Sequence, residues 1–240
     1  MNQPENANIA RRLLLFTFSH RTLALLRWDL HFLWIRFANF VCLRKRGLRK
    51  RIAAAEPPIY LNLGSGPRGL AYKHWINVDG YSDTNVHYLM DFTRSWPFRD
   101  SSIDGIFCEH VFEHFDFEQG QALLRESLRV LQPGGCIRII VPDGKKILET
   151  YVGNATELLA HRDHETECAM EVVNSYFRQR YEHQCIYDRQ LPEYQLGRAG
   201  FDQIDEASFG EGAVSRPVLL DDTRYEWESL YVEAIKPIRL

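Results

Sequence analysis

The stretch that most constrains the fold is Pro58 to Pro67, which reads Pro-Ile-Tyr-Leu-Asn-Leu-Gly-Ser-Gly-Pro. Its first half is an apolar run typical of a central parallel strand, and its second half places two glycines around Ser65. Gly64 and Gly66 permit backbone angles and a close approach to a ligand that a Cβ would prevent. Because Gly-x-Gly after a strand is also an ordinary turn, the residues that follow decide whether this loop binds a cofactor.

Strands and helices alternate along the chain after this loop. The alternation predicts a doubly wound α/β fold with a mostly parallel, Rossmann-like sheet. The intervals after the first two strands are short for helical crossovers, so one sheet face is expected to lack its usual helices. The ranges expected are strands at Trp75 to Asp79, Val86 to Asp91, Ser102 to Cys108 and Cys136 to Val141, a helix at Phe117 to Leu131, and an antiparallel pair at Phe201 to Phe209 and Ser229 to Lys236.

Acidic residues stand at the carboxyl ends of successive predicted strands. Asp79 ends the second strand, Asp91 ends the third, and Glu109 and His110 follow the fourth. Ligands of open parallel sheets bind at these ends, and carboxylates suit the ribose hydroxyls and amino group of a nucleoside. Together with the glycine loop the pattern indicates a nucleoside cofactor, although each aspartate alone is typical of a turn or a helix cap.

The motifs in this order resemble those of class I S-adenosylmethionine-dependent methyltransferases of the small-molecule group. The resemblance is strongest over residues 57 to 143 and implies a seven-stranded sheet of order 3-2-1-4-5-7-6 with the last strand antiparallel. It also implies S-adenosyl-L-methionine as the cofactor. The motifs are Leu61-Asn62-Leu63-Gly64-Ser65-Gly66, Ile76-Asn77-Val78-Asp79, Asp91-Phe92 with Trp96-Pro97-Phe98, Ser102 to Phe107 with Glu113-His114, and Arg129 to Gly135 with Ile139 to Asp143.

The resemblance further implies roles for individual residues. The family usually has an acidic residue where this chain has Asn62, so Asn62 is expected to organise the loop by hydrogen bonds without adding charge. The implied cofactor-binding residues are Gly64 and Gly66 at the methionine moiety, Asp79 at the ribose, Asp91 and Phe92 around the adenine, Glu109 near the sulfonium beside His110, and Asn62, Ser65 and Gly80 in the same set.

Three histidines, His110, His114 and His183, are candidates for a catalytic base. A sulfonium methyl group needs mainly in-line positioning, and a base is required only where the acceptor is a hydroxyl. Each candidate is also compatible with a histidine that bonds the backbone or caps a helix.

The distribution of cysteines and charges excludes several classes of protein. Five cysteines without a Cys-x-x-Cys pair indicate a reducing cytoplasm. His161, His164 and Cys168 recur at helical spacing, but without a compact paired motif no metal site is predicted. The N-terminus lacks the pattern of a signal peptide, and charged residues between positions 21 and 36 interrupt the candidate membrane span. We therefore expect a cytoplasmic protein.

Residues 1 to 55 are expected to form a basic, apolar N-terminal helical arm. The first 51 residues carry a net charge of +9, and the remainder carries −12. Apolar residues between Leu13 and Leu43 recur at helical spacing, and a dense basic cluster follows at Arg44 to Arg51. The arm either binds an anionic membrane surface through residues 13 to 51 or covers the sheet face that lacks helices, and the two interpretations are compatible.

Residues 56 to 240 are expected to form the methyltransferase domain, with a helical, substrate-facing insertion at 144 to 200. The predicted activity is methyl transfer to a small or lipid-linked acceptor, with a sugar hydroxyl as the expected group and peripheral attachment at the inner membrane face. Two alternatives remain. Asn62 and the short crossovers suit a cofactor-binding scaffold without catalysis, and the basic cluster suits a nucleic-acid methyltransferase, which is the less favoured of the two.

Overall fold

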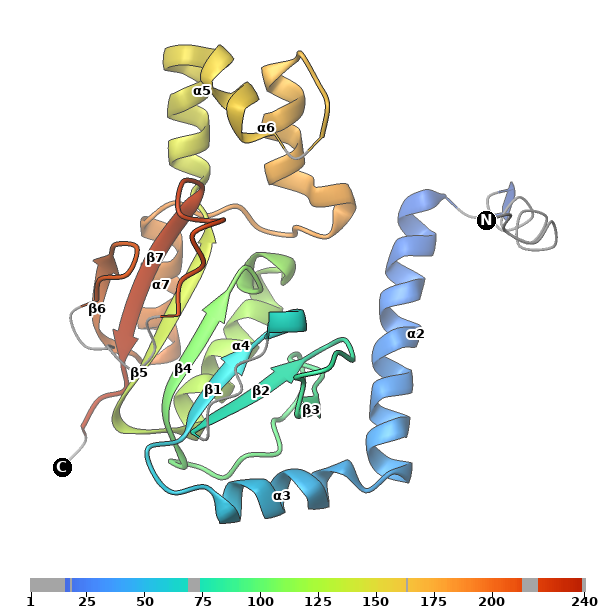
Figure 1. Ribbon diagram of the computed structural model, residues 1–240, viewed down its shortest axis with the longest axis vertical. Coiled ribbons are helices and arrows are strands. Elements are labelled where there is room, and N and C mark those ends of the chain that lie inside the picture. The colour runs from blue at the N-terminus through green and yellow to red at the C-terminus, as the bar shows by residue number, and fades with distance from the viewer. Residues whose placement is uncertain (1–15, 18, 69–73, 163, 213–219, 239–240) are drawn as a thin grey trace.

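A seven-stranded sheet forms the centre of the computed structural model, which describes residues 16–17, 19–68, 74–162, 164–212 and 220–238 (Figure 1). The strands are β1 (Tyr60–Leu63), β2 (Trp75–Asp79), β3 (Tyr88–Leu89), β4 (Ile103–Glu109), β5 (Leu131–Pro142), β6 (Asp202–Ala207) and β7 (Ser229–Ile235).

Adjacent strands follow the order β3-β2-β1-β4-β5-β7-β6. β7 runs antiparallel to both β5 and β6, and the other adjacent pairs are parallel. This confirms the predicted sheet order and the antiparallel strand. Two strands differ most in extent from the prediction: β3 has only two residues, and β5 starts at Leu131, directly after a helix and before the Pro-Gly-Gly turn.

Side chains alternate between the two faces of the sheet, as the period of two in a strand requires. On β5, Ile137 joins the larger hydrophobic core, whereas Cys136 joins a smaller cluster on the opposite face. The larger core is closed by α4 (Phe117–Val130), as predicted, and by α7 (Gln190–Ala199). α4 begins with a capping box, in which the side chains and backbone N–H groups of Asp116 and Gln119 bond reciprocally.

Described residues of the C-terminal part of the chain, among them Ala207, cover the opposite face of the sheet. Phe209 and Leu220 pack there against the smaller cluster. Arg138 on β5 is fully buried on this face and donates hydrogen bonds to Asp221 and to Glu233 on β7. For the described residues, the expectation that the N-terminal arm covers this face is therefore wrong, because the buried guanidinium needs acidic partners and the C-terminal segment supplies them.

Two helices make up the described part of the N-terminal arm. α2 (His20–Val41) starts after Ser19, whose side chain accepts a hydrogen bond from Thr22 N. The chain turns at Leu43, where φ is +48°, and the basic cluster forms a second helix, α3 (Arg44–Ala54), that the sequence did not predict. Residues 13 to 15 of the predicted helix lie outside the described residues.

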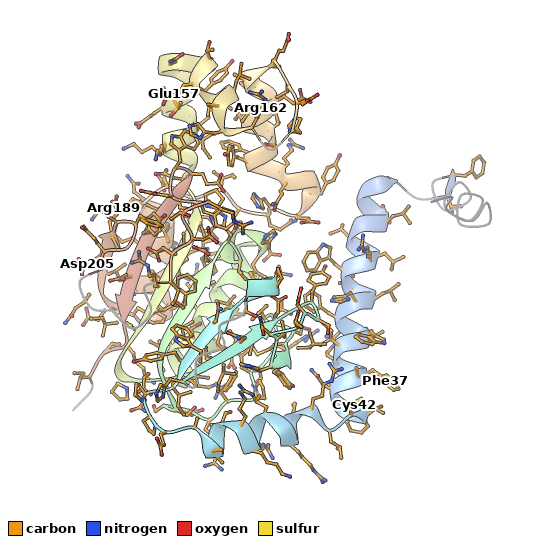
Figure 2. The ribbon with its side chains drawn as sticks, in the orientation of Figure 1. Phe37, Cys42, Glu157, Arg162, Arg189 and Asp205 are labelled. Atoms are coloured by element: carbon orange, nitrogen blue, oxygen red, sulfur yellow. The ribbon has the colours of Figure 1, made fainter. Side chains whose placement is uncertain are left out.

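The arm packs along the edge of the sheet. Figure 1 shows α2 beside the β3 edge of the sheet and α3 below the sheet. α2 buries Ile35 and Ala38, and α3 buries Leu48 in the larger core. The side chain of Phe37 points away from the domain (Figure 2). None of the described helices has both the length and the apolar character that a bilayer span requires.

A helical protrusion stands above the carboxyl ends of the strands (Figure 1). α5 (Gly144–Leu158) and α6 (Ala169–Arg178) share a small core of their own, whose members include Ile147 and Val172. α7 packs on the main domain instead, so the predicted insertion at 144 to 200 contains one helix that belongs to the larger core. Short 3-10 helices lie at Gly66–Arg68, Phe112–His114, Leu159–His161 and Gln179–Tyr181.

Candidate cofactor and acceptor site

The glycine loop after β1 is folded onto the end of β2. The N–H groups of Gly64 and Ser65 donate to Val78 O at 2.9 and 3.2 Å. Gly64 and Gly66 have φ values of +65° and +52°, which favour glycine. A Cβ on Gly64 would lie 2.0 Å from Cγ2 of Val111, so no larger residue fits there. The loop is therefore held by its backbone and by the absence of a side chain.

Asp79 connects the turns that follow β1 and β2. Its Oδ2 accepts a hydrogen bond from Gly66 N at 2.7 Å, and its Oδ1 accepts one from Tyr81 N at 2.7 Å. Bonds to an ionised carboxylate are among the stronger hydrogen bonds in proteins. Each oxygen has a second lone pair, so Asp79 can hold both turns and still accept from a ligand hydroxyl.

A cavity of about 500 Å³ opens at the carboxyl ends of β1, β2 and β4. Six residues predicted from the sequence line it: Gly64, Asp79, Gly80, Phe92, His110 and His114. The other lining residues are Arg27, Trp28, Phe32, Tyr81, Val111, Phe115, Tyr181 and Glu182.

The remaining predicted cofactor residues do not line this cavity. Asn62 lies on the opposite sheet face, with its Nδ2 3.5 Å from Oδ1 of Asn77. Glu109 accepts a hydrogen bond from Asp222 N at 2.9 Å. Ser65 is buried, and Gly66 is turned toward Asp79. Side-chain alternation along β1 explains the place of Asn62, because Tyr60 and Asn62 share a face.

Asp91 lies at the border of the site. Its Oδ1 accepts hydrogen bonds from N and Oγ1 of Thr93, at 3.1 and 2.6 Å, and its Oδ2 pairs with Nη1 of Arg36 at 3.3 Å. Asp91 lines a second, adjoining cavity of about 710 Å³. This cavity also contains His183, and it shares Trp28, Phe32, His114, Phe115, Tyr181 and Glu182 with the first cavity.

Helix α2 forms the outer wall of both cavities, which the sequence did not reveal. Trp28 and Phe32 line both, and His31 lies beside them with its Nε2 2.7 Å from Gly80 O. The imidazole of His31 also stacks on Tyr81, with ring centroids 4.4 Å apart. The sequence does show a second apolar face on this helix, which indicates a second contact. No pattern in neighbouring residues indicated that this face would contact Gly80.

A buried carboxylate lies among the three candidate histidines. Glu113 is 1% exposed, and its Oε1 is 3.3 Å from Nδ1 of His110 and 3.9 Å from Nε2 of His183. The rings of His114 and His183 meet edge to face, with centroids 5.0 Å apart. His110 has a φ of +51° and places its Nε2 3.0 Å from Oγ of Ser229. The structure thus brings together all three candidates, around a glutamate not predicted as a site residue.

The ionisable side chains of this cluster shift one another's pKa values. Burial acts to lower the pKa of His110, but the carboxylate of Glu113 outweighs burial, so the pKa is raised. Burial acts to raise the pKa of Glu113, but the neighbouring histidines, His110 foremost, lower it. Burial lowers the pKa of His183 despite the nearby Glu113. The cluster therefore favours an ionised carboxylate beside a neutral His183.

Comparisons with known proteins agree with this geometry. Residues 74–139 match the family model described as a methyltransferase domain. The matched segment is similar to that family. With the sheet order, the match confirms the resemblance to class I S-adenosylmethionine-dependent methyltransferases and implies S-adenosylmethionine as the cofactor. No curated protein matches the chain.

Solved structures similar to this chain include three described as S-adenosylmethionine-dependent methyltransferases. The one from Archaeoglobus fulgidus has 14% identity and a TM-score of 0.45, and the match covers 85% of this chain and 99% of that one. The one from Methanosarcina mazei has 13% identity, a TM-score of 0.47 and coverages of 78% and 97%. The one from Aquifex aeolicus has 14% identity, a TM-score of 0.43 and coverages of 80% and 89%.

The residues around the first cavity fit an adenosyl group linked to an amino acid. Gly64 leaves room that a Cβ would fill, Asp79 offers free lone pairs to ribose hydroxyls, and Phe92 provides an apolar surface. The predicted ribose contact of Asp79 and the adenine contact of Phe92 stay predictions. The carboxylate of Asp91 accepts a hydrogen bond from Thr93 and pairs with Arg36. Its predicted contact with adenine would therefore use the carboxylate lone pairs that face the second cavity.

Proposed function

We propose that this methyltransferase transfers a methyl group to a hydroxyl of a lipid-linked acceptor. The observation that supports this most directly is the pair of adjoining cavities, one at the glycine loop and one at His183, with His114 lining both. A cofactor in the first cavity and an acceptor in the second would meet beside the buried Glu113. Such a meeting point is what a direct, in-line transfer needs.

When bound, S-adenosylmethionine supplies a methyl group on a sulfonium, which is already a good electrophile. It would give that methyl group to the acceptor oxygen and leave as the neutral thioether, and the histidine cluster would receive the proton of the acceptor hydroxyl. His114 lines both cavities, and His110 lines the first one beside Glu113. In this proposal the walls from α2, Trp28 and Phe32, exclude water from the reacting groups.

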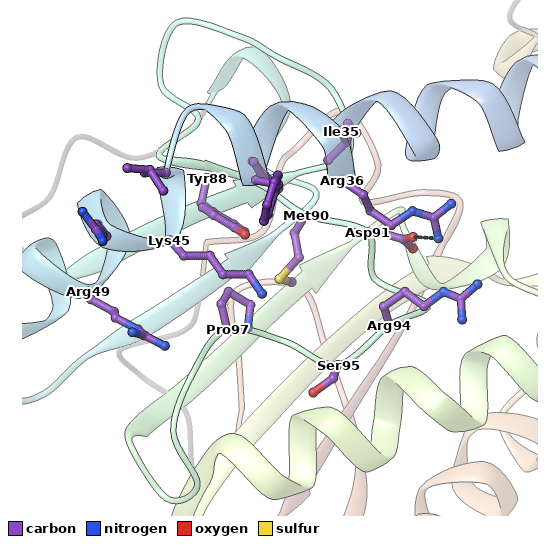
Figure 3. Close-up of a pocket in the computed structure, with 14 residues that line it drawn as sticks. Ile35, Arg36, Lys45, Arg49, Tyr88, Met90, Asp91, Arg94, Ser95 and Pro97 are labelled. Carbon is purple, nitrogen blue, oxygen red and sulfur yellow. Dashed lines mark ion pairs between the residues drawn. The ribbon is translucent and has the colours of Figure 1, made fainter.

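A basic pocket beside the second cavity supports an acceptor that carries phosphate. The pocket measures about 500 Å³ and lies at the elbow between α2 and α3 (Figure 3). Its apolar lining includes Ile35, Tyr88, Met90 and Pro97. Its basic residues are Arg36, Lys45, Arg46, Arg49 and Arg94, and Asp91 is its one acidic residue among those described.

Two features of this elbow pocket favour a phosphorylated ligand with hydroxyl groups. Among the described residues, Lys45, Arg46, Arg49 and Arg94 form no ion pair, whereas Arg36 pairs with Asp91. Asn39 lines the pocket, is 8% exposed, and its Oδ1 receives no hydrogen bond. A phosphate would satisfy the cations and a hydroxyl would satisfy the amide oxygen.

The outer surface of α2 supports a lipid environment for this acceptor. Large apolar side chains remain exposed along it, and α3 follows with six basic residues and no acidic one. An interfacial helix flanked by basic residues binds anionic bilayers, at about 1 kcal/mol per basic residue near the surface. The exposed apolar residues are Leu25, Leu26, Leu30, Leu33, Trp34, Phe37, Phe40, Val41 and Leu43.

The activity is tested with the full chain and S-adenosylmethionine carrying a radiolabelled methyl group. The acceptor probes are a polyprenyl-diphosphate-linked hexose in mixed vesicles and the free hexose 1-phosphate. We expect label in the lipid-linked hexose at a rate at least tenfold above the free phosphate. If neither probe is labelled, the proposed acceptor class is contradicted. If the lipid-linked hexose and the free hexose 1-phosphate are labelled at equal rates, the acceptor does not need its lipid.

Cofactor binding is measured separately by calorimetric titration with S-adenosylmethionine. We expect Asp79→Ala to weaken binding at least tenfold, because the carboxylate holds both turns and faces the first cavity. Asp83→Ala is the matched control, since Asp83 is an exposed aspartate whose Oδ1 bonds the neighbouring Thr84. No binding to the wild-type chain at millimolar cofactor would refute the enzyme and leave a different function for the fold.

Membrane attachment is tested by flotation with vesicles of phosphatidylcholine alone or with phosphatidylglycerol added. We expect the full chain to float only with the anionic vesicles and to lose this on the double change Lys45→Glu and Arg49→Glu. Lys145→Glu on α5 serves as the control, because Lys145 is an exposed lysine far from the arm in sequence. Binding to RNA that depends on the same two residues, without flotation, would favour the nucleic-acid alternative instead.

A further inference from the structure

The carboxylate of Glu113 lacks the hydrogen bonds that a buried carboxylate usually receives from its neighbours. Glu113 is fully buried, yet neither carboxylate oxygen receives a hydrogen bond. The nearest charged group is His110, whose Nδ1 lies 3.3 Å from Oε1. A buried carboxylate is costly unless it is paired and hydrogen-bonded, and this single ion pair leaves lone pairs of Glu113 available to a cation.

Backbone contacts determine which nitrogen of His114 and of His183 carries the proton in the neutral ring. Nδ1 of His183 lies 2.6 Å from Tyr176 O, and Nδ1 of His114 lies 3.2 Å from Glu182 O. A carbonyl oxygen only accepts hydrogen bonds, so both Nδ1 atoms must carry the proton. In the neutral form each ring therefore presents an unprotonated Nε2, and for His183 that atom is 3.9 Å from Oε1 of Glu113.

Three side chains that can each offer an electron pair to a cation thus converge. One ligand atom each from Glu113, His114 and His183 lies within 4.8 Å of the other two. Histidines that ligate metals typically donate their second ring N–H to a backbone carbonyl or a carboxylate, which fixes the tautomer and the ring orientation.

We infer that Glu113, His114 and His183 form a binding site for one divalent transition-metal cation, with Zn²⁺ the best match. Two histidines and one glutamate are a known ligand set of catalytic zinc, which keeps a further position open. In tetrahedral zinc two ligand atoms lie about 3.3 Å apart, so from a separation of up to 4.8 Å the ligand atoms need to approach by at most about 1.5 Å. The carboxylate and imidazole set is less suited to Mg²⁺, which prefers oxygen ligands.

The position of the site gives the cation a role in the proposed reaction. His114 and His183 line the second cavity, so an open coordination position would face the acceptor. A cation there would lower the pKa of a hydroxyl that reaches it, so the hydroxyl proton would leave to water and neither ligating histidine would have to accept it. This role rests on the proposed function, whereas binding of the cation does not.

The inference is tested on the full chain after chelator treatment, by titration with Co²⁺ and competition with Zn²⁺. Co²⁺ bound by nitrogen and oxygen ligands gives visible absorption bands that need neither cofactor nor acceptor. We expect one equivalent of Co²⁺ per chain, displaced by one equivalent of Zn²⁺. Glu113→Gln, His114→Ala and His183→Ala are each expected to weaken Zn²⁺ binding at least tenfold, since a lost ligand costs no less than a lost outer-shell partner.

His164→Gln is the matched control, because His164 lies outside the cluster and pairs with Glu171 at 3.7 Å. It should bind Zn²⁺ as the wild type does. Zn²⁺ binding that is unchanged by all three cluster substitutions would overturn the inference, and so would a wild-type chain that binds neither Co²⁺ nor Zn²⁺. If the Glu113→Gln variant fails to fold, the His114→Ala variant decides the result, because His114 is only half-buried. Methyl transfer is measured apart from this titration, so failure of one proposal is distinguishable from failure of the other.

Discussion

Arg36 on α2 and Asp91 after β3 form an ion pair, with Nη1 and Oδ2 3.3 Å apart, at the border between the elbow pocket and the second cavity. The side chain of Asp91 is 5% exposed and that of Arg36 is 41% exposed. The pair therefore joins the N-terminal arm to the rim of the cofactor and acceptor site. Residues that were predicted to belong to separate parts of the chain share one wall.

Loss of this ion pair should loosen the arm. Arg36→Ala leaves the buried Asp91 without its cation, at a cost of about 1–3 kcal/mol in unfolding free energy, as for other orphaned buried groups. Adding Asp91→Asn should recover part of this loss, because the remaining group is then neutral. Urea unfolding of the single and double variants measures both effects. Equal destabilisation by the single and double changes would contradict a direct interaction between the two side chains.

Gly64 and Gly66 should respond differently to alanine. Both have positive φ, which costs a residue with a Cβ about 1–2 kcal/mol. Only Gly64→Ala also places a Cβ against Val111, whereas no atom lies within 4 Å of a Cβ on Gly66. Overpacking adds about 1–3 kcal/mol at Gly64. Urea midpoints of the two variants should therefore separate, and a Gly66→Ala variant as unstable as Gly64→Ala would refute the contact.

Arg138 should be among the most sensitive positions for stability. Its Nη1 lies 2.7 Å from Oε1 of Glu233, and its Nη2 donates to Asp221 and to Ser208 O. Arg138→Met leaves two buried carboxylates without their cation, which costs about 3–5 kcal/mol. Arg189→Met is the control, because Arg189 pairs with Glu193 and Glu206 at the surface, where such pairs contribute about 0–1 kcal/mol. Chemical unfolding should show this contrast, and similar losses from both substitutions would contradict it.

Glu126 should make the fold sensitive to acid. Burial acts to raise its pKa, but hydrogen bonds from Arg129 and from Trp96 N outweigh burial and lower it below 4.5. A pKa lowered on folding gives stability that is complete above the unfolded value and is lost as pH falls through the folded value. Glu126→Gln should therefore destabilise the chain at pH 7, and this effect should shrink as the pH is lowered below 4.5, as measured by urea unfolding. Glu157→Gln, at an exposed residue, should show no such change, and a pH-independent loss at Glu126 would contradict the assignment.

Local patterns in the sequence determined much of the fold. The apolar run before Gly64 predicted β1, the segment from Trp75 to Asp79 matches β2 at both ends, and the spacing of Leu123 and Leu124 predicted α4. These features depend on residues within a few positions of each other. The sheet order followed from a resemblance carried by ordered motifs, and the structure has that order.

Only the tertiary structure decided how the site is closed. His31 contacts Gly80, which is 49 positions away in the sequence, and Arg138 contacts Glu233, which is 95 positions away. His183 and Glu113, which lie close together in the site, are also far apart in the sequence. No local pattern contains such pairs, because they form when separate elements pack and their buried charges must be paired. The sequence by itself therefore determined the strands, the glycine loop and the candidate histidines. Packing decided that α2 would wall the cavities and that a buried glutamate would gather the histidines around it.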